Sequence, residues 1–236
     1  MGIPVSFVLV LVSVLAADLQ KTCDSGTLAD CVTLAGTYAD RDWPRALQIY
    51  DDACTRGAPA ACYYLGLAYL LGADVPKDLP RAARLLQRAC DGGEAEACAE
   101  LASAYDTGRP DAEILPRDTE RAQALFRRVA HLTGKACDAG DLRGCGGLAR
   151  LYTMGNGVPK DLAKAARLLR KGCEGGDPVQ CRRLGHVYAR GEGAKKDAGK
   201  AVELFRQACA AGIREACQDI KRLQWAEITG STRRRE

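Results

Sequence analysis

Twelve cysteines are the residues of this chain whose type and spacing point most directly to chemistry. They fall into six pairs, and the two members of each pair stand eight positions apart. The pairs are Cys23/Cys31, Cys54/Cys62, Cys90/Cys98, Cys137/Cys145, Cys173/Cys181 and Cys209/Cys217. Zinc sites use closer cysteine spacings than these, and an even, dense set persists as disulfides in an oxidising compartment. The cysteines therefore indicate structural disulfides, with no metal or other cofactor.

Other residue types give no recognisable catalytic pattern. None of the five serines is followed three residues later by lysine, so the Ser-x-x-Lys motif of serine β-lactam hydrolases is absent. The two histidines, His131 and His186, lie too far apart in sequence to suggest a His-rich zinc site. The Gly-x-Gly runs at Gly155 and Gly191 follow no predicted strand, so we interpret them as turns rather than nucleotide-binding loops. No catalytic residue is predicted.

The chain repeats itself with a period of about 36 residues, which indicates stacked supersecondary units. The second cysteine of a pair begins each of five units, near residues 31, 62, 98, 145 and 181. A leucine follows three positions later, a small residue four and a tyrosine seven, as in Cys181, Leu184, Gly185 and Tyr188. These offsets lie on one face of an α-helix. We name this predicted element helix A and expect its tyrosine to be a core residue.

A second predicted helix, helix B, follows a short loop in every unit. In four units helix A runs into a glycine and a basic–acidic step precedes helix B: Lys77-Asp78, Arg117-Asp118, Lys160-Asp161 and Lys196-Asp197. The aspartate is expected to cap helix B by accepting free amide protons. An alanine followed by two large apolar residues, as at Ala201, Leu204 and Phe205, marks its buried face.

Each cysteine pair joins helix B to the next helix A, and the helix must break between the two cysteines. Residues eight apart in one helix are about 12 Å apart, whereas a disulfide needs Cα atoms within about 7 Å. Helix-breaking residues do lie there: Gly92-Gly93, Gly175-Gly176, Gly57 with Pro59, and Gly140 with Asp141. Connectivity of 12 cysteines cannot in general be assigned from sequence, but six identical local spacings make local pairing the simplest solution.

Two units depart from the period. The first is short, which predicts a trimmed A–B loop near residues 40–43. The third has four extra residues within 109–118 and seven more at 131–137. Seven residues are nearly two helical turns, so a longer helix B could keep Cys137 facing the next unit. The alternative is that Gly134 interrupts this helix.

The two ends of the chain are expected to differ from the repeats. Residues 1–16 suit a signal peptide, because their uncharged apolar run is too short to span a bilayer; a short anchor is the alternative. Residues 17–236 would form the mature, secreted or periplasmic domain, with no membrane span left. A cap helix over 216–228, with Ile220, Leu223 and Trp225 covering the apolar end, would precede a free tail at 229–236.

The pattern Cys-x-x-Leu-Gly/Ala-x-x-Tyr, a glycine loop, Lys-Asp, and then Leu-Leu/Phe-x-x-Ala-Cys resembles the Sel-1-like repeat, a relative of the tetratricopeptide repeat. The cysteine pairs make the chain similar to the secreted cysteine-rich Sel-1-like proteins of the Helicobacter type. The resemblance covers about residues 22–228 and implies an all-α, right-handed α-solenoid with inter-repeat disulfides. It also implies an interaction scaffold, and several such proteins have been labelled penicillin-binding proteins or β-lactamases.

The leading hypothesis is a monomeric scaffold that binds a protein or peptide partner. Its candidate surface is the part of the A helices that lies off the Leu/Tyr stripe. The residues singled out there are Tyr63, Tyr64, Arg150, Arg182, Arg183, His186 and Arg190, with His186 expected to be exposed. A net charge of only +4 gives no basic patch for nucleic acid. The alternatives are an activity on β-lactam or cell-wall substrates, suggested by the resemblance alone, and a redox-linked assembly factor.

Overall fold

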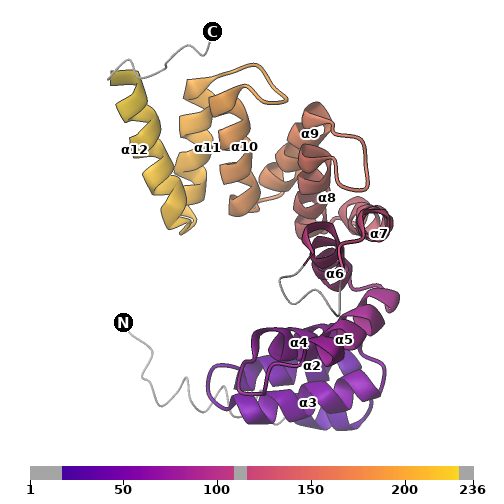
Figure 1. Ribbon diagram of the computed structural model, residues 1–236. Helices are drawn as coiled ribbons and strands as arrows, with labels where there is room; N and C mark the ends of the chain where they lie inside the picture. The colour runs from indigo at the N-terminus through magenta and orange to yellow at the C-terminus, as the bar shows by residue number, and fades with distance from the viewer. Residues whose placement is uncertain (1–17, 109–115, 229–236) are drawn as a thin grey trace, which may run out of the picture. The chain divides into compact units, whose positions relative to one another are not determined.

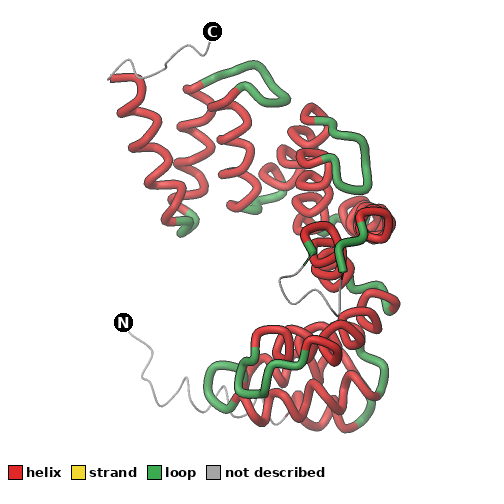
Figure 2. The backbone as a smooth tube through the Cα atoms, in the orientation of Figure 1, coloured by secondary structure: helices red, strands yellow, loops and turns green. Residues whose placement is uncertain are grey.

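The computed structural model describes residues 18–108 and 116–228 (Figure 1). The predicted signal peptide at 1–16, the tail at 229–236 and residues 109–115 of the predicted insertion lie outside the described residues. Within the described ranges every regular element is a helix, as Figure 2 shows. The predicted all-α repeat architecture is confirmed.

The helices alternate along the chain as the A and B helices of successive repeats. The A helices are α2 (Leu28–Tyr38), α4 (Pro59–Leu71), α6 (Ala95–Thr107), α8 (Leu142–Met154) and α10 (Pro178–Arg190). The B helices are α3 (Trp43–Thr55), α5 (Leu79–Asp91), α7 (Thr119–Asp138), α9 (Leu162–Glu174) and α11 (Ala198–Ala210). Residues 18–24 are also helical, and α12 (Arg214–Ile228) ends the described chain.

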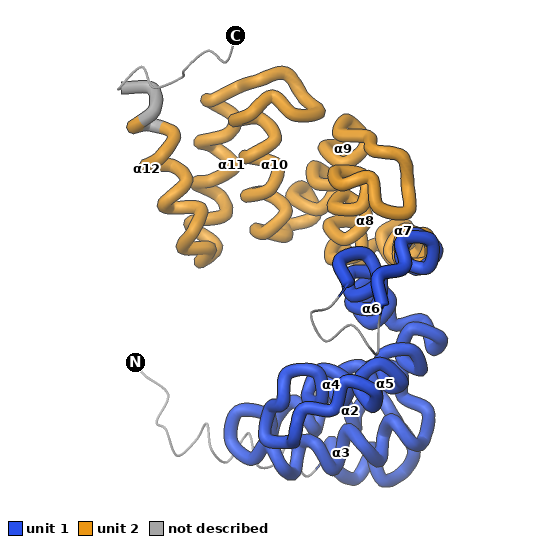
Figure 3. The backbone as a smooth tube through the Cα atoms, viewed as in Figure 1, with its two compact units in different colours: residues 1–125 blue, residues 126–236 orange. Residues whose placement is uncertain are grey.

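The chain forms two compact units, which meet in sequence at Leu125 and Phe126 (Figure 3). In unit 1, α2 packs on α3 and α4 packs on α5, while α3–α4 and α5–α6 join successive repeats. In unit 2, α8, α9, α10, α11 and α12 each pack on the next helix along the chain. Each unit thus has its own core of buried helix faces.

The same set of hydrogen bonds closes the loop between helix A and helix B in all five repeats. The amide of the capping aspartate donates to the carbonyl of the repeat tyrosine, at 2.7 Å for Asp42 and Tyr38 and 2.8 Å for Asp118 and Tyr105. The capping carboxylate accepts from the amide three residues later, and the basic side chain of that third residue lies over the tyrosine ring. The cation and the ring attract each other electrostatically. The start of helix B is therefore held beside the repeat tyrosine of helix A, whatever the length of the loop between them.

The inter-repeat disulfides predicted from the spacing are present. The structure pairs Cys23–Cys31, Cys54–Cys62, Cys90–Cys98, Cys137–Cys145, Cys173–Cys181 and Cys209–Cys217, with Cα–Cα distances of 4.5–5.0 Å. A glycine with positive φ breaks the helix between the two cysteines of each pair, as Gly176 does at φ 95°. A residue without a Cβ adopts this conformation most easily.

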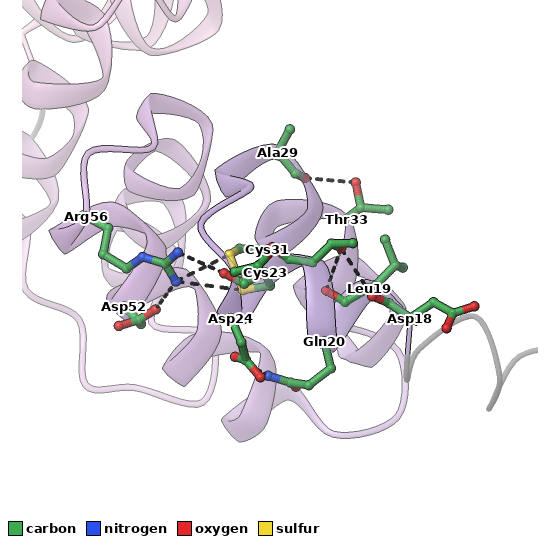
Figure 4. Close-up of a disulfide and its surroundings, with 12 residues drawn as sticks. Asp18, Leu19, Gln20, Cys23, Asp24, Ala29, Cys31, Thr33, Asp52 and Arg56 are labelled. Carbon is green, nitrogen blue, oxygen red and sulfur yellow. Dashed lines mark hydrogen bonds and ion pairs between the residues drawn. A yellow bond between two sulfur atoms is a disulfide. The ribbon is translucent and has the colours of Figure 1, made fainter.

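Basic side chains tie the end of one helix B to the end of the preceding one. Arg56 donates to the carbonyl of Cys23, beside the first disulfide, and to Asp52 (Figure 4). Arg88 donates to the carbonyl of Thr55, and Lys171 to that of Cys137. Cations at helix C-termini satisfy carbonyls that lack helical partners and complement the helix dipole. These contacts stabilise the stacking of consecutive repeats.

The long seventh helix confirms the first of the two alternatives for residues 131–137. α7 runs without a break from Thr119 to Asp138, so Gly134 does not interrupt it. Its buried Thr133 hydroxyl donates to the carbonyl of Val129 at 2.7 Å, which satisfies a polar group inside the core. Gly144 of α8 lets the two helices approach closely, because a Cβ there would lie 2.7 Å from the Cβ of Ala136.

The cap helix α12 differs from expectation at one residue. Ile220 and Leu223 are partly buried against the core formed by Phe205, Ala208 and Ala216, as predicted. Trp225 has 69% of its surface exposed, so the expectation that it covers the apolar end is wrong. The core of the last repeat is filled by Phe205 itself, which packs where Gly185 leaves room.

Candidate functional site

A pocket of about 320 Å³ opens on the A-helix surface of unit 2, between α8 and α10. Ala149, Leu169 and Val187 line it with apolar surface. Its polar lining consists of Arg150, Thr153, Arg183, His186, Arg190 and Glu192. We call this feature the α8–α10 pocket.

The helical repeat explains why these side chains meet. Arg183, His186, Val187 and Arg190 follow the 0, 3, 4, 7 spacing of one helix face, next to the buried face that carries Cys181, Leu184 and Gly185. On α8, Arg150 adjoins the buried Ala149, and Thr153 stands one turn beyond Arg150. Leu169 of α9 packs with Ala149 and closes the pocket from below.

The charge of the α8–α10 pocket is only weakly neutralised from within. Arg150 is exposed and has no hydrogen-bond or ion-pair partner among the described residues. Arg183 makes one long contact of 3.5 Å, to the carbonyl of Gly146. Arg190 and Glu192 are 3.9 Å apart and both largely exposed, and such pairs contribute little. The guanidinium groups are therefore available to an anionic ligand.

A buried carboxylate behind the pocket holds two of the predicted site residues. Asp219 of α12 is 5% exposed and accepts from Arg182 Nε at 2.6 Å and from His186 Nε2 at 3.2 Å. The His186 ring also meets the Phe205 ring edge-on, with centroids 5.0 Å apart. His186 is thus half-buried, and the expectation of an exposed histidine is wrong, because α12 covers that side of α10.

The environment of His186 favours its neutral form. Burial lowers the pKa of His186 from its ordinary value, and Arg182 and Arg190 lower it further, while Asp219 acts in the opposite direction. His186 therefore contributes a neutral ring to the α8–α10 pocket, and the positive charge comes from the arginines.

The two tyrosines of the predicted surface belong to unit 1 and form a separate aromatic cluster. Tyr64 stacks on Tyr50 with ring centroids 5.1 Å apart, and Tyr63 lies 5.4 Å from Tyr64. Tyr50 is buried between α3 and α4, and burial raises its pKa to about 12. Burial and the nearby Glu100 and Glu96 also raise the pKa of Tyr63. Tyr64, 41% exposed, presents one edge of this cluster to solvent.

The structure thus brings together four of the seven predicted surface residues: Arg150, Arg183, His186 and Arg190. Arg182 is directed to Asp219, and Tyr63 and Tyr64 lie in the other unit. Sequence reasoning missed Asp219, whose partners His186 and Arg182 are 33 and 37 positions away, and Glu192 in the glycine loop. It also missed Leu169 as a pocket residue, because Ala165, Leu168 and Leu169 repeat the helix-B pattern of Ala201, Leu204 and Phe205 and so indicate only a core position.

The described residues show neither a metal site nor a membrane-spanning helix. They hold no group of three or more His, Cys, Asp or Glu side chains placed to bind a metal ion. Among the same residues, no helix is both long enough and apolar enough to cross a membrane.

Comparisons with known proteins agree with the repeat pattern. The family model described as Sel1 repeat matches residues 59–94, 95–141, 143–177 and 181–213, more than half of the chain. No curated protein matches. A Sel1 repeat protein from Oxalobacter formigenes is 24% identical, with 82% of this chain and 75% of that chain covered and a TM-score of 0.60.

Two further solved structures are similar. A putative Sel1 repeat protein from Klebsiella pneumoniae is 18% identical, covers 89% of this chain and 99% of its own, and gives a TM-score of 0.52. Cysteine rich protein B from Helicobacter pylori is 32% identical over 62% of this chain and 98% of its own, with a TM-score of 0.40. On the match of the family model over most of its repeats, the chain belongs to the Sel1 repeat family.

Proposed function

We propose that this protein is an exported, non-catalytic repeat scaffold that binds a protein or peptide partner on the A-helix surface of unit 2. The observation that supports it is the α8–α10 pocket, in which Arg150 has no partner among the described residues. A concave site with an apolar lining and a few polar groups is the usual form of a binding site.

Rigidity supports the same proposal. The disulfide Cys173–Cys181 fixes the start of α10 against the end of α9, and Cys137–Cys145 fixes the start of α8. The two A helices that line the pocket are therefore held before any partner arrives. A preorganised surface loses less conformational entropy on binding. The same disulfides favour an oxidising location, secreted or periplasmic.

Site-specific photo-crosslinking tests the proposal. A photoreactive amino acid is placed at position 150 or 187, on the pocket, and at position 167 or 206, on exposed faces of α9 and α11 in the same unit. We expect one discrete adduct from the pocket positions in the native extracellular or envelope fraction. The adduct is identified by mass spectrometry and reconstituted from purified partner. Equal labelling from the control positions, or none from the pocket, would contradict the proposal.

A further inference from the structure

We infer that the α8–α10 pocket takes an acidic segment of a partner protein, with one apolar side chain on the pocket floor and flanking carboxylates on the arginine rim. The inference rests on the proposed function and names the chemistry of the partner. It follows from the distribution of charge and apolar surface around the pocket.

The rim carries more positive than negative charge. Arg150 comes from α8, and Arg183 and Arg190 come from α10, while Glu192 is the one carboxylate that lines the pocket. The neighbouring carboxylate, Asp219, is buried and engaged by Arg182 and His186, so it does not neutralise the rim. Guanidinium groups bind carboxylates in a planar, two-pronged geometry. A segment with acidic side chains on both flanks can reach arginines of both helices.

The apolar floor of the α8–α10 pocket favours an apolar side chain at the centre of the bound partner segment. Ala149 and Leu169 are 1% and 6% exposed, and Val187 lies partly buried above them. Val187 supplies the exposed apolar part of this floor, because Ala149 and Leu169 are already almost fully buried. A small anion alone would leave Val187 in contact with water, whereas an aliphatic side chain would bury it and gain free energy. The combination favours a peptide of mixed character over an inorganic or sugar-linked anion.

Packing explains why the pocket is open in this repeat. At the small-residue position of helix A, α8 has Ala149 facing Leu169, whereas α10 has Gly185 facing Phe205. The bulkier Phe205 fills its site and contacts His186, so the groove beyond α10 is closed by a ring and by α12. Leu169, the corresponding residue of α9, instead lines the α8–α10 pocket. The two repeats therefore differ at this position, with Leu169 lining an open pocket and Phe205 filling the equivalent space.

Fluorescence anisotropy with defined peptides tests the inference on the oxidised full chain. The probe is the labelled, end-blocked pentapeptide Glu-Asp-Leu-Glu-Asp, compared with Lys-Lys-Leu-Lys-Lys and Glu-Asp-Ser-Glu-Asp. We expect the acidic leucine peptide to bind, the basic peptide not to bind, and the serine peptide to bind at least about fivefold more weakly. Added salt should weaken the acidic complex, because exposed charges are screened.

Matched variants locate the binding. The pocket variant is Arg150→Glu with Arg183→Glu, and the control is Arg167→Glu with Arg206→Glu, which changes the net charge equally on exposed B-helix positions. The pocket variant should lose at least about tenfold in affinity and the control less than about twofold. The milder Arg150→Gln removes a charge that has no partner in the described chain, so it should keep the fold and still weaken binding.

The outcomes separate this inference from the proposed function. Equal losses in the pocket and control variants, or equal binding of the basic peptide, would overturn the inference. If the cross-linked partner still bound the pocket variant while labelling remained confined to positions 150 and 187, the scaffold function would stand and the acidic segment would be wrong. Absence of a discrete cross-linked partner would instead remove the proposed function.

Discussion

Asp219 supplies polar contacts between α10 of the last repeat and the cap helix α12. Its carboxylate is 5% exposed and accepts from Arg182 at 2.6 Å and from His186 at 3.2 Å. Moving a carboxylate out of water costs free energy, and hydrogen bonds from charged donors offset that cost. The same pairing takes Arg182 away from the binding surface and fixes His186 beside the α8–α10 pocket.

Replacing Asp219 by Asn should loosen α12 and change the titration of His186. The change removes the charge that Arg182, His186 and Arg222 share. Because these partners are at least about a third exposed, the loss should be about 1–3 kcal/mol. Because Asp219 raises the pKa of His186 against the effect of burial, that pKa should fall further in Asp219→Asn. Thermal unfolding and a proton NMR titration measure both effects, with the exposed His131 as the reference signal. A His186 pKa that rose would contradict this account.

Glu94 should make unit 1 less stable at high pH. Burial and the neighbouring Glu96 raise the pKa of Glu94 from 4.5 to about 7. Between these values the folded chain keeps a proton that the unfolded chain has released, so stability falls as the pH rises through this window. Glu94→Gln removes that loss, and its melting temperature should gain on the parent between pH 4.5 and pH 8. Glu100→Gln, on the exposed face of α6, is the control and should show no such trend.

At the level of helices, the two Gly-x-Gly loops, which follow α8 and α10, pack closely on helix B of the preceding repeat. Gly157 has φ 68°, and a Cβ on it would collide with the backbone at Phe126 and Arg127 of α7. Gly193 stands in the same relation to Leu162 of α9. The second glycine of each loop thus serves close repeat packing, which the interpretation as turns had not foreseen.

Gly157→Ala should therefore destabilise more than Gly176→Ala. Both positions have positive φ, and alanine there costs about 1–2 kcal/mol in either case. Only position 157 adds a steric clash, worth about a further 1–3 kcal/mol, because nothing lies within 4 Å of a Cβ at 176. Urea unfolding of the oxidised proteins measures the difference. Equal free energies of unfolding would show that the loop does not pack as described.

Local sequence patterns predicted the helices, their N-caps and the disulfides, because each of these features depends on residues close in the chain. Asp161 and Asp197 were predicted as N-caps. Their carboxylates accept hydrogen bonds from the backbone amides of Lys164 and Lys200, as expected. The pocket depends on three helices at once and on the difference between Leu169 and Phe205, so its volume could not be predicted from spacing. Asp219 was missed because nothing in its local sequence distinguishes it from a solvated helix residue.

Across the whole molecule the disulfides supply stability that thin apolar cores do not. Each disulfide closes a loop of about nine residues and stabilises by about 2–3 kcal/mol, and the six together reach on the order of 15 kcal/mol. Full reduction should lower the melting temperature by at least about 20 °C or unfold the chain. Circular dichroism melts with and without reductant measure this, with thiol counting to verify reduction. A fully reduced protein with an unchanged melting temperature would refute the stabilising role of the disulfides.

The central claim is that the α8–α10 pocket of this rigid scaffold binds a partner. The most direct measurement is the affinity of the purified, cross-linked partner for the parent chain, for Arg150→Glu with Arg183→Glu, and for Arg167→Glu with Arg206→Glu. We expect a loss of at least about tenfold for the pocket variant and nearly parental affinity for the control. Parental affinity in the pocket variant, with its helices intact by circular dichroism and with labelling no longer confined to positions 150 and 187, would contradict it.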